Sequence, residues 1–421
     1  MPLPDLIEIL PLTGPVEARL AVPGSKSLTN RALVLAALAP GETTLTGALW
    51  SEDTQVMVEA LGRLGFAVRV EADSRERCNR TITIQGMGGR VPAGGPRDRP
   101  MDLFVGNAGT AARFLTALIC LGEGSYRLHG VARMHERPQA PLFAALRHLG
   151  YCIDSPNDRL PAVVHGAGPR PGRCRIAVEP SSQFASALLL CGSTAGWEVE
   201  VAGEDAEESP YVEMTRRLVE AFPRHGGVWS IEPDASSGSY FWAAKWLLHP
   251  SAALAIDWPA SRWQIDADFN GYWPLPPELS RAGQLGDSIM TAIVLAPFGA
   301  RPTRFTNLGR LRVQECERVA ALRTELTKCG AQVVETGDTL EVFPSLLRGA
   351  EIETYNDHRM AMCFAILGLK VPGVRIKNPA CVKKTFPNFF QKLAGAPPQG
   401  LGAAVCNRGG DRLAVEELFA D

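Results

Sequence analysis

Cations and small polar residues gather in several short stretches of this 421-residue chain. The first, residues 23–31, reads PGSKSLTNR, so a Pro-Gly turn precedes Lys26, two hydroxyl side chains and Arg31. Lysine supplies a compact charge and arginine a planar fork of donors, and both suit phosphate and carboxylate groups. The stretch lacks the Gly-x-x-x-x-Gly-Lys pattern of a P-loop. It therefore predicts an anion site of another kind.

Six further stretches have the same character. Small residues beside an arginine or lysine let a phosphate or carboxylate approach the backbone. Asp287, Glu315 and Asp357 lie among these cations and could serve as acid or base. Taken singly, each stretch has an ordinary interpretation as a turn, a helix N-cap or a solvated surface charge. The stretches are residues 106–113, 133–138, 180–183, 312–318, 355–362 and 382–387.

The elements that must position these residues follow a repeated pattern. Four segments carry apolar residues three or four positions apart, which is typical of a helix with one buried face. Gly65, Gly150, Gly226 and Gly330 stand where a left-handed C-cap is needed, and alternating or β-branched residues then predict a strand. The spacing of roughly 75 to 105 residues is too long for a solenoid and favours subdomains of similar α/β fold. The segments are residues 57–70, 142–154, 219–231 and 322–335.

Four more segments, rich in Ala and Leu, predict buried helices. Each follows polar or glycine residues that suit a helix N-terminus. Buried N-termini aimed at one space form an anion site from backbone N–H groups and helix dipoles. Residues 258–286 have no clear period and predict an irregular connection or a divergent repeat. The helical segments are residues 27–39, 109–121, 182–192 and 288–297.

The composition excludes several classes of protein. A formal net charge of −2 leaves no global field to attract nucleic acid or a membrane, so any anion site must be local. No apolar run reaches the length of a membrane span, and the first residues do not resemble a signal peptide. The 10 cysteines contain no Cys-x-x-Cys pair, so we expect reduced thiols, a cytoplasmic location and no metal site.

In their order along the chain, these motifs resemble the family of 5-enolpyruvylshikimate-3-phosphate synthase, or 3-phosphoshikimate 1-carboxyvinyltransferase. The resemblance covers residues 23–390 and weakens over 258–286. Each motif alone is weak, but the ordered set is specific. The motifs are PGSKS followed by NRAL, GNAGTAAR, SSQF, PYVEMT, DASSGSYF, ETYNDHRMAM and KKTFP.

The resemblance implies an α/β (α+β) fold of two similar domains. Each would hold three βαβαββ-type repeats with helices packed inward, the inside-out α/β barrel of the enolpyruvyl transferases. We expect one domain to comprise residues 1–22 and 239–421, the other residues 23–238, and the active site to lie in the interdomain cleft.

The resemblance also implies an enzyme of the shikimate pathway to chorismate and the aromatic amino acids. Members transfer the enolpyruvyl group of phosphoenolpyruvate to the 5-hydroxyl of shikimate 3-phosphate and release phosphate through a tetrahedral intermediate. This is the sixth step of the pathway. It needs no cofactor or metal, and we expect a monomer because the family builds its site within one chain.

Matching the motifs assigns roles to individual residues. Asp287 would accept the proton of the attacking hydroxyl, Glu315 would exchange the proton at C3 of the enol, and Lys26 would assist the leaving phosphate. His358 would orient its neighbours or hydrogen-bond the phosphate. The expected ligands of shikimate 3-phosphate are Lys26, Ser27, Arg31, Ser181, Ser182, Gln183, Tyr211, Asp287 and Gln314. Those of phosphoenolpyruvate are Lys26, Asn107, Gly109, Arg137, Gln183, Arg318, Arg359 and Lys384.

Two departures from the family pattern concern the ring substrate. Gln314 stands where the family usually has lysine, and we expect its amide to bond a substrate oxygen while Arg310 or Arg312 supplies charge. Glu208 replaces a usual serine and would repel a phosphate. Ser209 would take over that contact if the loop shifts by one residue.

A third departure is Phe114, where many members have proline. It follows the loop that carries Gly109, so we expect a displaced Gly109–Thr110 segment. The enzyme would then bind glyphosate, the inhibitor that occupies the phosphoenolpyruvate site in many members, only weakly.

Three other functions compete with this interpretation. The related transferase acting on UDP-N-acetylglucosamine usually carries a reactive cysteine in a mobile loop, and residues 133–138 contain none. A paralogue acting on another cyclic alcohol is favoured by Gln314, Glu208 and the divergent residues 258–286. A non-catalytic binding protein would need the cations but not both Asp287 and Glu315.

Overall fold

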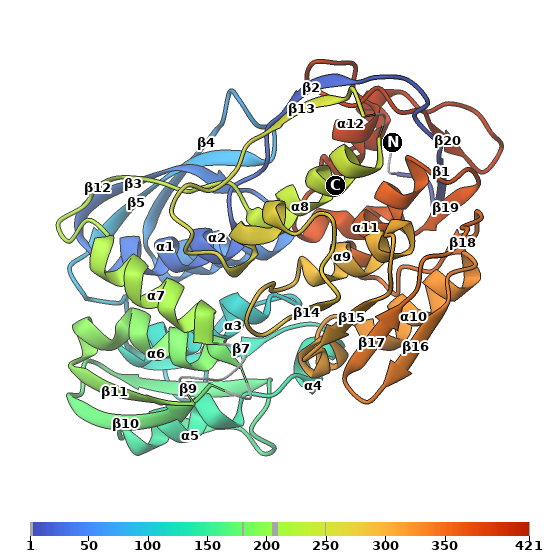
Figure 1. The fold of residues 1–421 in the computed structure, drawn as a ribbon. Helices are drawn as coiled ribbons and strands as arrows, with labels where there is room; N and C mark the ends of the chain where they lie inside the picture. Colours follow the sequence, from blue (N-terminus) through green and yellow to red (C-terminus); the bar gives the residue numbers. More distant parts are fainter. Residues whose placement is uncertain (1–2, 179–180, 204–208, 249, 421) are drawn as a thin grey trace. The chain divides into compact units, whose positions relative to one another are not determined.

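The computed structural model describes residues 3–178, 181–203, 209–248 and 250–420. The chain divides into two compact units, which Figure 1 colours along the sequence: unit 1 is Met1–Pro23 with Pro233–Asp421, and unit 2 is Gly24–Glu232. The predicted crossing near Val22 lies one residue before the first division. The crossing predicted near Ser239 differs, because Ser239 lies inside helix α8 (Ala235–Leu247), which belongs wholly to unit 1.

Unit 2 contains one complete βαβαββ repeat. Its four strands form a sheet in the order β6-β7-β9-β8, in which β6 and β7 are parallel and the other neighbours antiparallel. A short helix, α4 (Ala132–Glu136), interrupts the second crossover. The repeat consists of β6 (Met101–Phe104), α3 (Gly109–Cys120), β7 (Glu123–His129), α5 (Ala140–His148), β8 (Cys152–Asp154) and β9 (Ala162–Ala167).

The two remaining repeats of unit 2 are joined by a strand exchange. Strand β12 (Gly227–Ser230), from the end of the unit, pairs in parallel with β3 (Pro40–Leu49) of the first repeat. The third repeat keeps only the parallel pair β10 and β11, and Figure 1 shows α6 lying against it. Their other elements are α1 (Lys26–Leu38), α2 (Glu52–Leu64), β4 (Ala67–Ala72), β5 (Asn79–Met87), β10 (Gly172–Ala177), α6 (Ser182–Ala195), β11 (Trp197–Ala202) and α7 (Ser209–Ala221).

Unit 1 repeats the same scheme. The sheet of its complete repeat has the order β14-β15-β17-β16. A second sheet includes β1, from the start of the chain, in the order β18-β19-β1-β20. The third is the parallel pair β2 and β13. The strands are β1 (Leu6–Ile9), β2 (Glu17–Leu20), β13 (Ala253–Ile256), β14 (Glu278–Ser280), β15 (Thr303–Thr306), β16 (Val333–Thr336), β17 (Thr339–Val342), β18 (Glu351–Ile352), β19 (Val374–Lys377) and β20 (Val405–Asn407). The helices beside α8 are α9 (Ile289–Leu295), α10 (Arg318–Lys328), α11 (His358–Gly368) and α12 (Phe389–Ala394), with 3-10 turns at η1 (Ile265–Gly271), η2 (Ala296–Phe298), η3 (Gly309–Val313), η4 (Pro379–Lys384) and η5 (Val415–Leu418).

Three helices of each unit are buried on nearly every side. In unit 2 these are α1, α3 and α6, and in unit 1 they are α8, α9 and α11, which Figure 1 shows side by side. All 12 residues of α3 and all 7 of α9 are buried. Such helices must be apolar all round, which the Ala- and Leu-rich segments satisfy. The expected inward packing of helices is therefore confirmed, with open sheets as the outer layer of each unit.

The four predicted C-cap glycines all have positive φ, at 103° for Gly65, 89° for Gly150, 79° for Gly226 and 91° for Gly330. Gly65 is the C-cap of α2, and Gly150 and Gly330 directly follow the last turns of α5 and α10. The prediction is wrong for Gly226, because α7 ends five residues earlier, at Ala221. There the positive φ serves the turn that enters β12.

Within the part of the chain that the structure describes, no helix is long and apolar enough to cross a membrane. All ten cysteines lie among the described residues, and none of them forms a disulfide.

Candidate active site

The predicted ligands in unit 2 gather at the N-termini of its three buried helices. Lys26 and Ser27 begin α1, Gly109 begins α3, and Ser182 begins α6. Ser181 caps α6 by accepting a hydrogen bond from the backbone N–H of Gln183 at 3.3 Å. Helix N-termini present unpaired N–H groups and a partial positive charge, so this end of unit 2 suits anions.

Arg31 fastens these helices together. It is 2% exposed, and its guanidinium donates to Thr215 Oγ1 on α7 at 2.7 Å and to Ser186 Oγ on α6 at 3.1 Å. It also donates to the carbonyl oxygen of Ser27 at 2.9 Å, and its guanidinium carbon lies 5.2 Å from the ring centre of Phe114 on α3. These contacts give Arg31 a structural role, and its direct contact with a substrate stays a prediction.

Lys26 has a carboxylate partner that the sequence analysis missed. Its Nζ lies 3.1 Å from Asp53 Oδ2, and the two side chains are 19% and 6% exposed. Asp53 lies in the first turn of α2, after the N-cap Ser51. The pair neutralises a partly buried charge and fixes the ammonium at the start of α1.

Two guanidinium groups crowd the N-terminus of α3. Arg137 donates to the carbonyl oxygen of Asn107 at 3.0 Å, and Arg113 donates to that of Pro138 at 3.0 Å. A Cβ at Gly109 would lie 2.6 Å from Arg137 Nη2 and closer still to Arg113 Nη1, so a larger residue would displace the two guanidinium groups. These cations strengthen the anion-binding character of the α3 N-terminus.

Unit 1 brings arginines and carboxylates together in a largely buried cluster. Arg318, 1% exposed at its side chain, lies 2.6 Å from Asp357, 2.7 Å from Glu315 and 3.7 Å from Asp287. Arg359 Nε lies 3.2 Å from Asp287 Oδ2. Asp287, the predicted base, and Glu315, the predicted proton carrier, thus contact the same arginine, Arg318.

Lys384 and Arg281 complete this cluster. Lys384 Nζ lies 3.8 Å from Glu315 Oε1. Arg281, which the sequence analysis missed, is 2% exposed at its side chain and lies 3.3 Å from Asp287 Oδ1. The cluster therefore holds four cations and three carboxylates, and this excess of positive charge favours the entry of anions.

The charges of this cluster shift the acidity of its members. Burial by itself raises the pKa of Asp287, but Arg359, Arg318 and Arg281 outweigh it and hold the pKa well below the usual range. Burial by itself lowers the pKa values of Arg318 and Arg359. The neighbouring carboxylates outweigh this effect, so both pKa values lie above the usual value for arginine. Asp287 is therefore ionised at neutral pH, and the arginines limit its basicity while they face it.

His358 and Asp357 stand at the N-terminus of α11. Asp357 is the N-cap and accepts a hydrogen bond from the backbone N–H of Arg359 at 2.9 Å. His358 is 1% exposed, with its Nδ1 3.6 Å from Asp357 Oδ1. The imidazole is thus packed beside the carboxylate that holds Arg318, which fits the predicted orienting role.

Gln314 bridges the cluster. Its amide nitrogen donates to Asp287 Oδ1 at 3.5 Å, and its amide oxygen accepts from Arg318. We expected Arg310 or Arg312 to supply the charge of the missing lysine. This stays a prediction for Arg310, whereas Arg312 is already held by three carboxylates. They are Glu317, Glu335 and Asp338.

The other departures find different outcomes. Glu208 lies outside the described residues. Ser209 begins α7 and donates to the carbonyl oxygen of Gly203 at 3.2 Å. Tyr211, in the first turn of α7, offers its carbonyl oxygen to Arg31 at 3.5 Å.

Residues 258–286 supply two positioning residues that no periodicity could reveal. Asp266, 5% exposed, accepts hydrogen bonds from the backbone N–H groups of Gly286 at 2.9 Å and Ser288 at 3.0 Å, on either side of Asp287. Gln264 accepts one from the N–H of Ala235 at 3.0 Å, at the start of α8. Burial raises the pKa of Asp266. The expected irregular connection thus holds the N-termini of two buried helices.

Comparison with known proteins places these features in one family. The family model described as EPSP synthase (3-phosphoshikimate 1-carboxyvinyltransferase) matches residues 12–225 and 275–393. A 3-phosphoshikimate 1-carboxyvinyltransferase of Opitutus terrae is 41% identical over 94% of this chain and 98% of its own length. One of Laribacter hongkongensis is 40% identical over 93% and 98%.

Solved structures agree on the fold. The EPSP synthase of Acinetobacter baumannii superimposes with a TM-score of 0.75 at 21% identity, covering 96% of this chain and 100% of that one. The enolpyruvyl transferase NikO of Streptomyces tendae gives 0.67 at 16% identity, covering 96% and 99%.

Inward-packed helices, repeated sheets and helix N-termini rich in cations define an enolpyruvyl transferase fold. Within that class, the relatives extend over nearly the whole chain. The chain belongs to the EPSP synthase (3-phosphoshikimate 1-carboxyvinyltransferase) family. The resemblance stated from the motifs is thereby confirmed.

Proposed function

We propose that this chain transfers the enolpyruvyl group of phosphoenolpyruvate to the 5-hydroxyl of shikimate 3-phosphate and releases phosphate. Relatives described as 3-phosphoshikimate 1-carboxyvinyltransferases, at 41% and 40% identity, support this function. The single observation that carries the mechanism is the cluster in unit 1, where Asp287 and Glu315 contact the same buried Arg318. A base and a proton carrier on one cation suit a reaction that adds a proton and later removes it.

In the proposed addition step, Asp287 accepts the proton of the 5-hydroxyl as the oxygen attacks C2 of the enol. Glu315, which takes up a proton from solvent once substrate anions draw Arg318 away from it, delivers this proton to C3. C3 becomes a methyl group, and a tetrahedral intermediate forms. In the elimination step the C–O bond to phosphate breaks, assisted by Lys26. A proton returns from C3 to Glu315 and restores the double bond.

The ion pairs of Asp287 explain how its basicity can rise when substrate binds. Without substrate, Asp287 and Glu315 neutralise arginines that would otherwise be buried without compensation, which is costly. An incoming carboxylate or phosphate offers Arg318, Arg359 and Lys384 a new partner. Their hold on Asp287 weakens, so its pKa rises toward a value suited to general base catalysis.

The residues at the helix N-termini of unit 2 supply the remaining contacts of this proposal. Lys26 and Gln183 would meet both substrates, and Arg137 with Gly109 would meet phosphoenolpyruvate. Transfer requires this set and that of unit 1 to act on one pair of substrates. Both sets belong to one chain, so we propose a monomer, and the ten free thiols favour the reducing cytoplasm.

A phosphate-release assay tests this function. The purified chain should release phosphate when phosphoenolpyruvate and shikimate 3-phosphate are both present, and neither substrate alone should suffice. Shikimate without its phosphate and other cyclic alcohols serve as alternative acceptors. Release only with another acceptor would assign the chain to a paralogue, and no release with any acceptor would favour a binding protein.

A further inference from the structure

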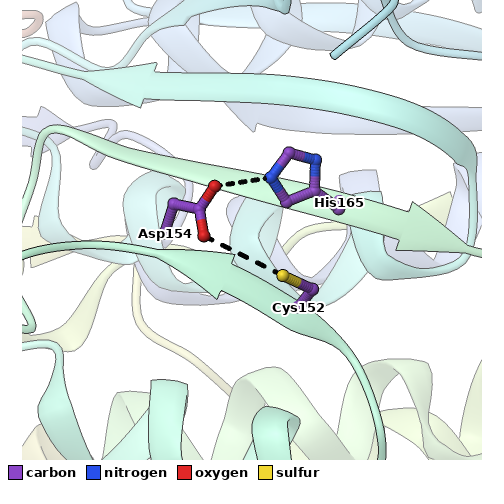
Figure 2. A group of neighbouring side chains, drawn as sticks. All are labelled: Cys152, Asp154 and His165. Carbon is purple, nitrogen blue, oxygen red and sulfur yellow. Dashed lines mark hydrogen bonds and ion pairs between the residues drawn. The ribbon is translucent and has the colours of Figure 1, made fainter.

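Three side chains with metal-binding atoms converge on the outer face of one sheet of unit 2. Cys152 and Asp154 lie on the edge strand β8, and His165 lies directly opposite Cys152 on β9. Residues two apart on a strand share a face, and Ile153 between them is buried, so this face points away from the core. Figure 2 shows Asp154 linked to both of the other side chains.

The distances are close to those of a metal site. His165 Nε2 lies 2.8 Å from Asp154 Oδ2, and Cys152 Sγ lies 3.9 Å from Asp154 Oδ1. All three ligand atoms lie within 4.8 Å of one another, the only such trio found among the described residues. In tetrahedral zinc sites, bond lengths of about 2.0 to 2.3 Å put the ligand atoms about 3.3 to 3.8 Å apart. Movements of about 1 Å, which side-chain rotation provides, would close the site.

A further contact orients the histidine. His165 Nδ1 lies 2.8 Å from the hydroxyl of Ser125, a residue of β7 that is 3% exposed. When Nδ1–H donates to this oxygen, the lone pair of Nε2 faces Asp154 and Cys152. Metal-binding histidines are commonly oriented by such a bond from their second ring nitrogen.

The thiol distinguishes this group from an ordinary surface ion pair. The same sheet carries such a pair, in which His129 Nε2 lies 2.7 Å from Asp102 Oδ2 and no cysteine is part of the group. Sulfur at 3.9 Å from a carboxylate oxygen is a weak hydrogen-bonding partner, but it is a strong ligand for zinc. Arg97 Nη2 lies 3.9 Å from Asp154, where its charge would repel a bound metal ion. The Arg97 side chain is 76% exposed, however, and can turn away.

We propose that Cys152, Asp154 and His165 bind one divalent transition-metal ion of the zinc type, with water in the fourth position. One sulfur, one nitrogen and one oxygen ligand suit zinc and do not suit magnesium or calcium, which prefer oxygen alone. Binding replaces the bond between His165 and Asp154. The proton that Nε2 donates in that bond is transferred through solvent to Nδ1, which then donates to Ser125, and the thiol proton is released to solvent. The ion would tie the edge strand β8 to β9, and none of the three residues belongs to the proposed catalytic machinery.

The test uses the full chain after dialysis against a chelator. Zn²⁺ is titrated in competition with a chromophoric chelator, and Co²⁺ is added separately because a thiolate bound to cobalt absorbs strongly in the near ultraviolet. We expect one ion per chain. Cys152→Ser and His165→Gln should each weaken binding at least tenfold, and Cys152→Ser should abolish the thiolate band. Ser125→Ala, which leaves every ligand in place, should weaken binding about tenfold.

His129→Gln is the matched control, because it breaks a histidine–aspartate pair of the same sheet that has no thiol. It should leave the affinity unchanged, and all four variants should keep the phosphate-release rate. The proposal is overturned if the chain does not bind Zn²⁺, if Cys152→Ser binds it as well as the wild type, or if His129→Gln weakens it as much as His165→Gln.

Discussion

Replacing Asp287 by asparagine removes a carboxylate that contacts three largely buried arginines. Arg359, Arg281 and Arg318 lie 3.2, 3.3 and 3.7 Å from its oxygens. Arg318 keeps Glu315 and Asp357, so the loss falls mainly on Arg359 and Arg281. The asparagine amide oxygen would still accept hydrogen bonds, but a neutral side chain cannot balance the charge of the arginines.

The size of the effect follows from these distances. At 3.2 Å and an effective dielectric constant of about 20, the gross attraction between Arg359 and Asp287 is about 5 kcal/mol. Relief of the desolvated carboxylate offsets part of it, and breaking a buried pair on one side usually costs about 3 to 5 kcal/mol. We expect Asp287→Asn to lower the free energy of unfolding by about 3 kcal/mol. For a unit of this size, that is a fall in Tm of about 10 °C.

Thermal unfolding followed by circular dichroism measures this fall, with Asp338→Asn as the matched control. Asp338 lies 2.8 Å from Arg312, but its side chain is 59% exposed, so its removal should cost less than about 1 kcal/mol. Phosphoenolpyruvate should raise the Tm of Asp287→Asn more than that of the wild type, because the arginines have lost a competing anion. Turnover should fall by about 10² to 10⁴.

The pH dependence has a definite sign. The pKa of Asp287 is lowered by folding, so its contribution to stability is present above about pH 4, the value of an unfolded aspartate, and is lost as the pH falls. The difference between wild type and Asp287→Asn should be constant from pH 8 to about pH 5 and should shrink below about pH 4. Equal stability of the two proteins at neutral pH, or a difference that grows on acidification, would show that the arginines do not stabilise ionised Asp287.

Three further predictions concern Asp266, Gln314 and Phe114. Asp266→Ala should lower kcat about tenfold with little change in KM, because two buried N–H groups beside Asp287 lose their acceptor. Asp266→Asn keeps an acceptor and should retain most of kcat, so equal losses for both variants in steady-state assays would contradict this. Gln314→Lys should give no gain in kcat/KM for shikimate 3-phosphate, because the amide already bridges Asp287 and Arg318; a gain of several tenfold would show that the site lacks a cation. Glyphosate should inhibit the wild type only weakly and Phe114→Pro more strongly, and micromolar inhibition of the wild type in competition with phosphoenolpyruvate would contradict the role given to Phe114.

The buried helices are the part of the fold that the sequence predicts well. Ala- and Leu-rich segments can satisfy a fully buried helix, and the predicted residues 109–121 and 182–192 correspond closely to α3 (Gly109–Cys120) and α6 (Ser182–Ala195). The exchange of β1 and β12 between repeats was not predictable in the same way. Each is a short strand whose partner lies far along the chain, and local patterns do not encode such pairing.

The site residues also fall into a group that the sequence predicts and a group that it does not. Ordered motifs are enough to nominate Asp287, Glu315 and Arg318, because each stands in a short stretch of distinctive residues. Asp266 and Arg281 act from an aperiodic segment, and their partners become neighbours only through folding. Asp266 also lies outside the residues that the family model matches, so no family motif could point to it, whereas Arg281 lies inside them but in no motif that the sequence analysis used.

In the proposed mechanism, Asp287 and Glu315 carry out addition and elimination at the enol. The most direct measurement is a single turnover in D₂O with shikimate 3-phosphate and phosphoenolpyruvate, followed by NMR of the enolpyruvyl group. We expect deuterium at C3 of the product and of recovered phosphoenolpyruvate, only when the ring substrate is present, and much less of it in Glu315→Gln. Phosphate release with no deuterium at C3 would contradict it.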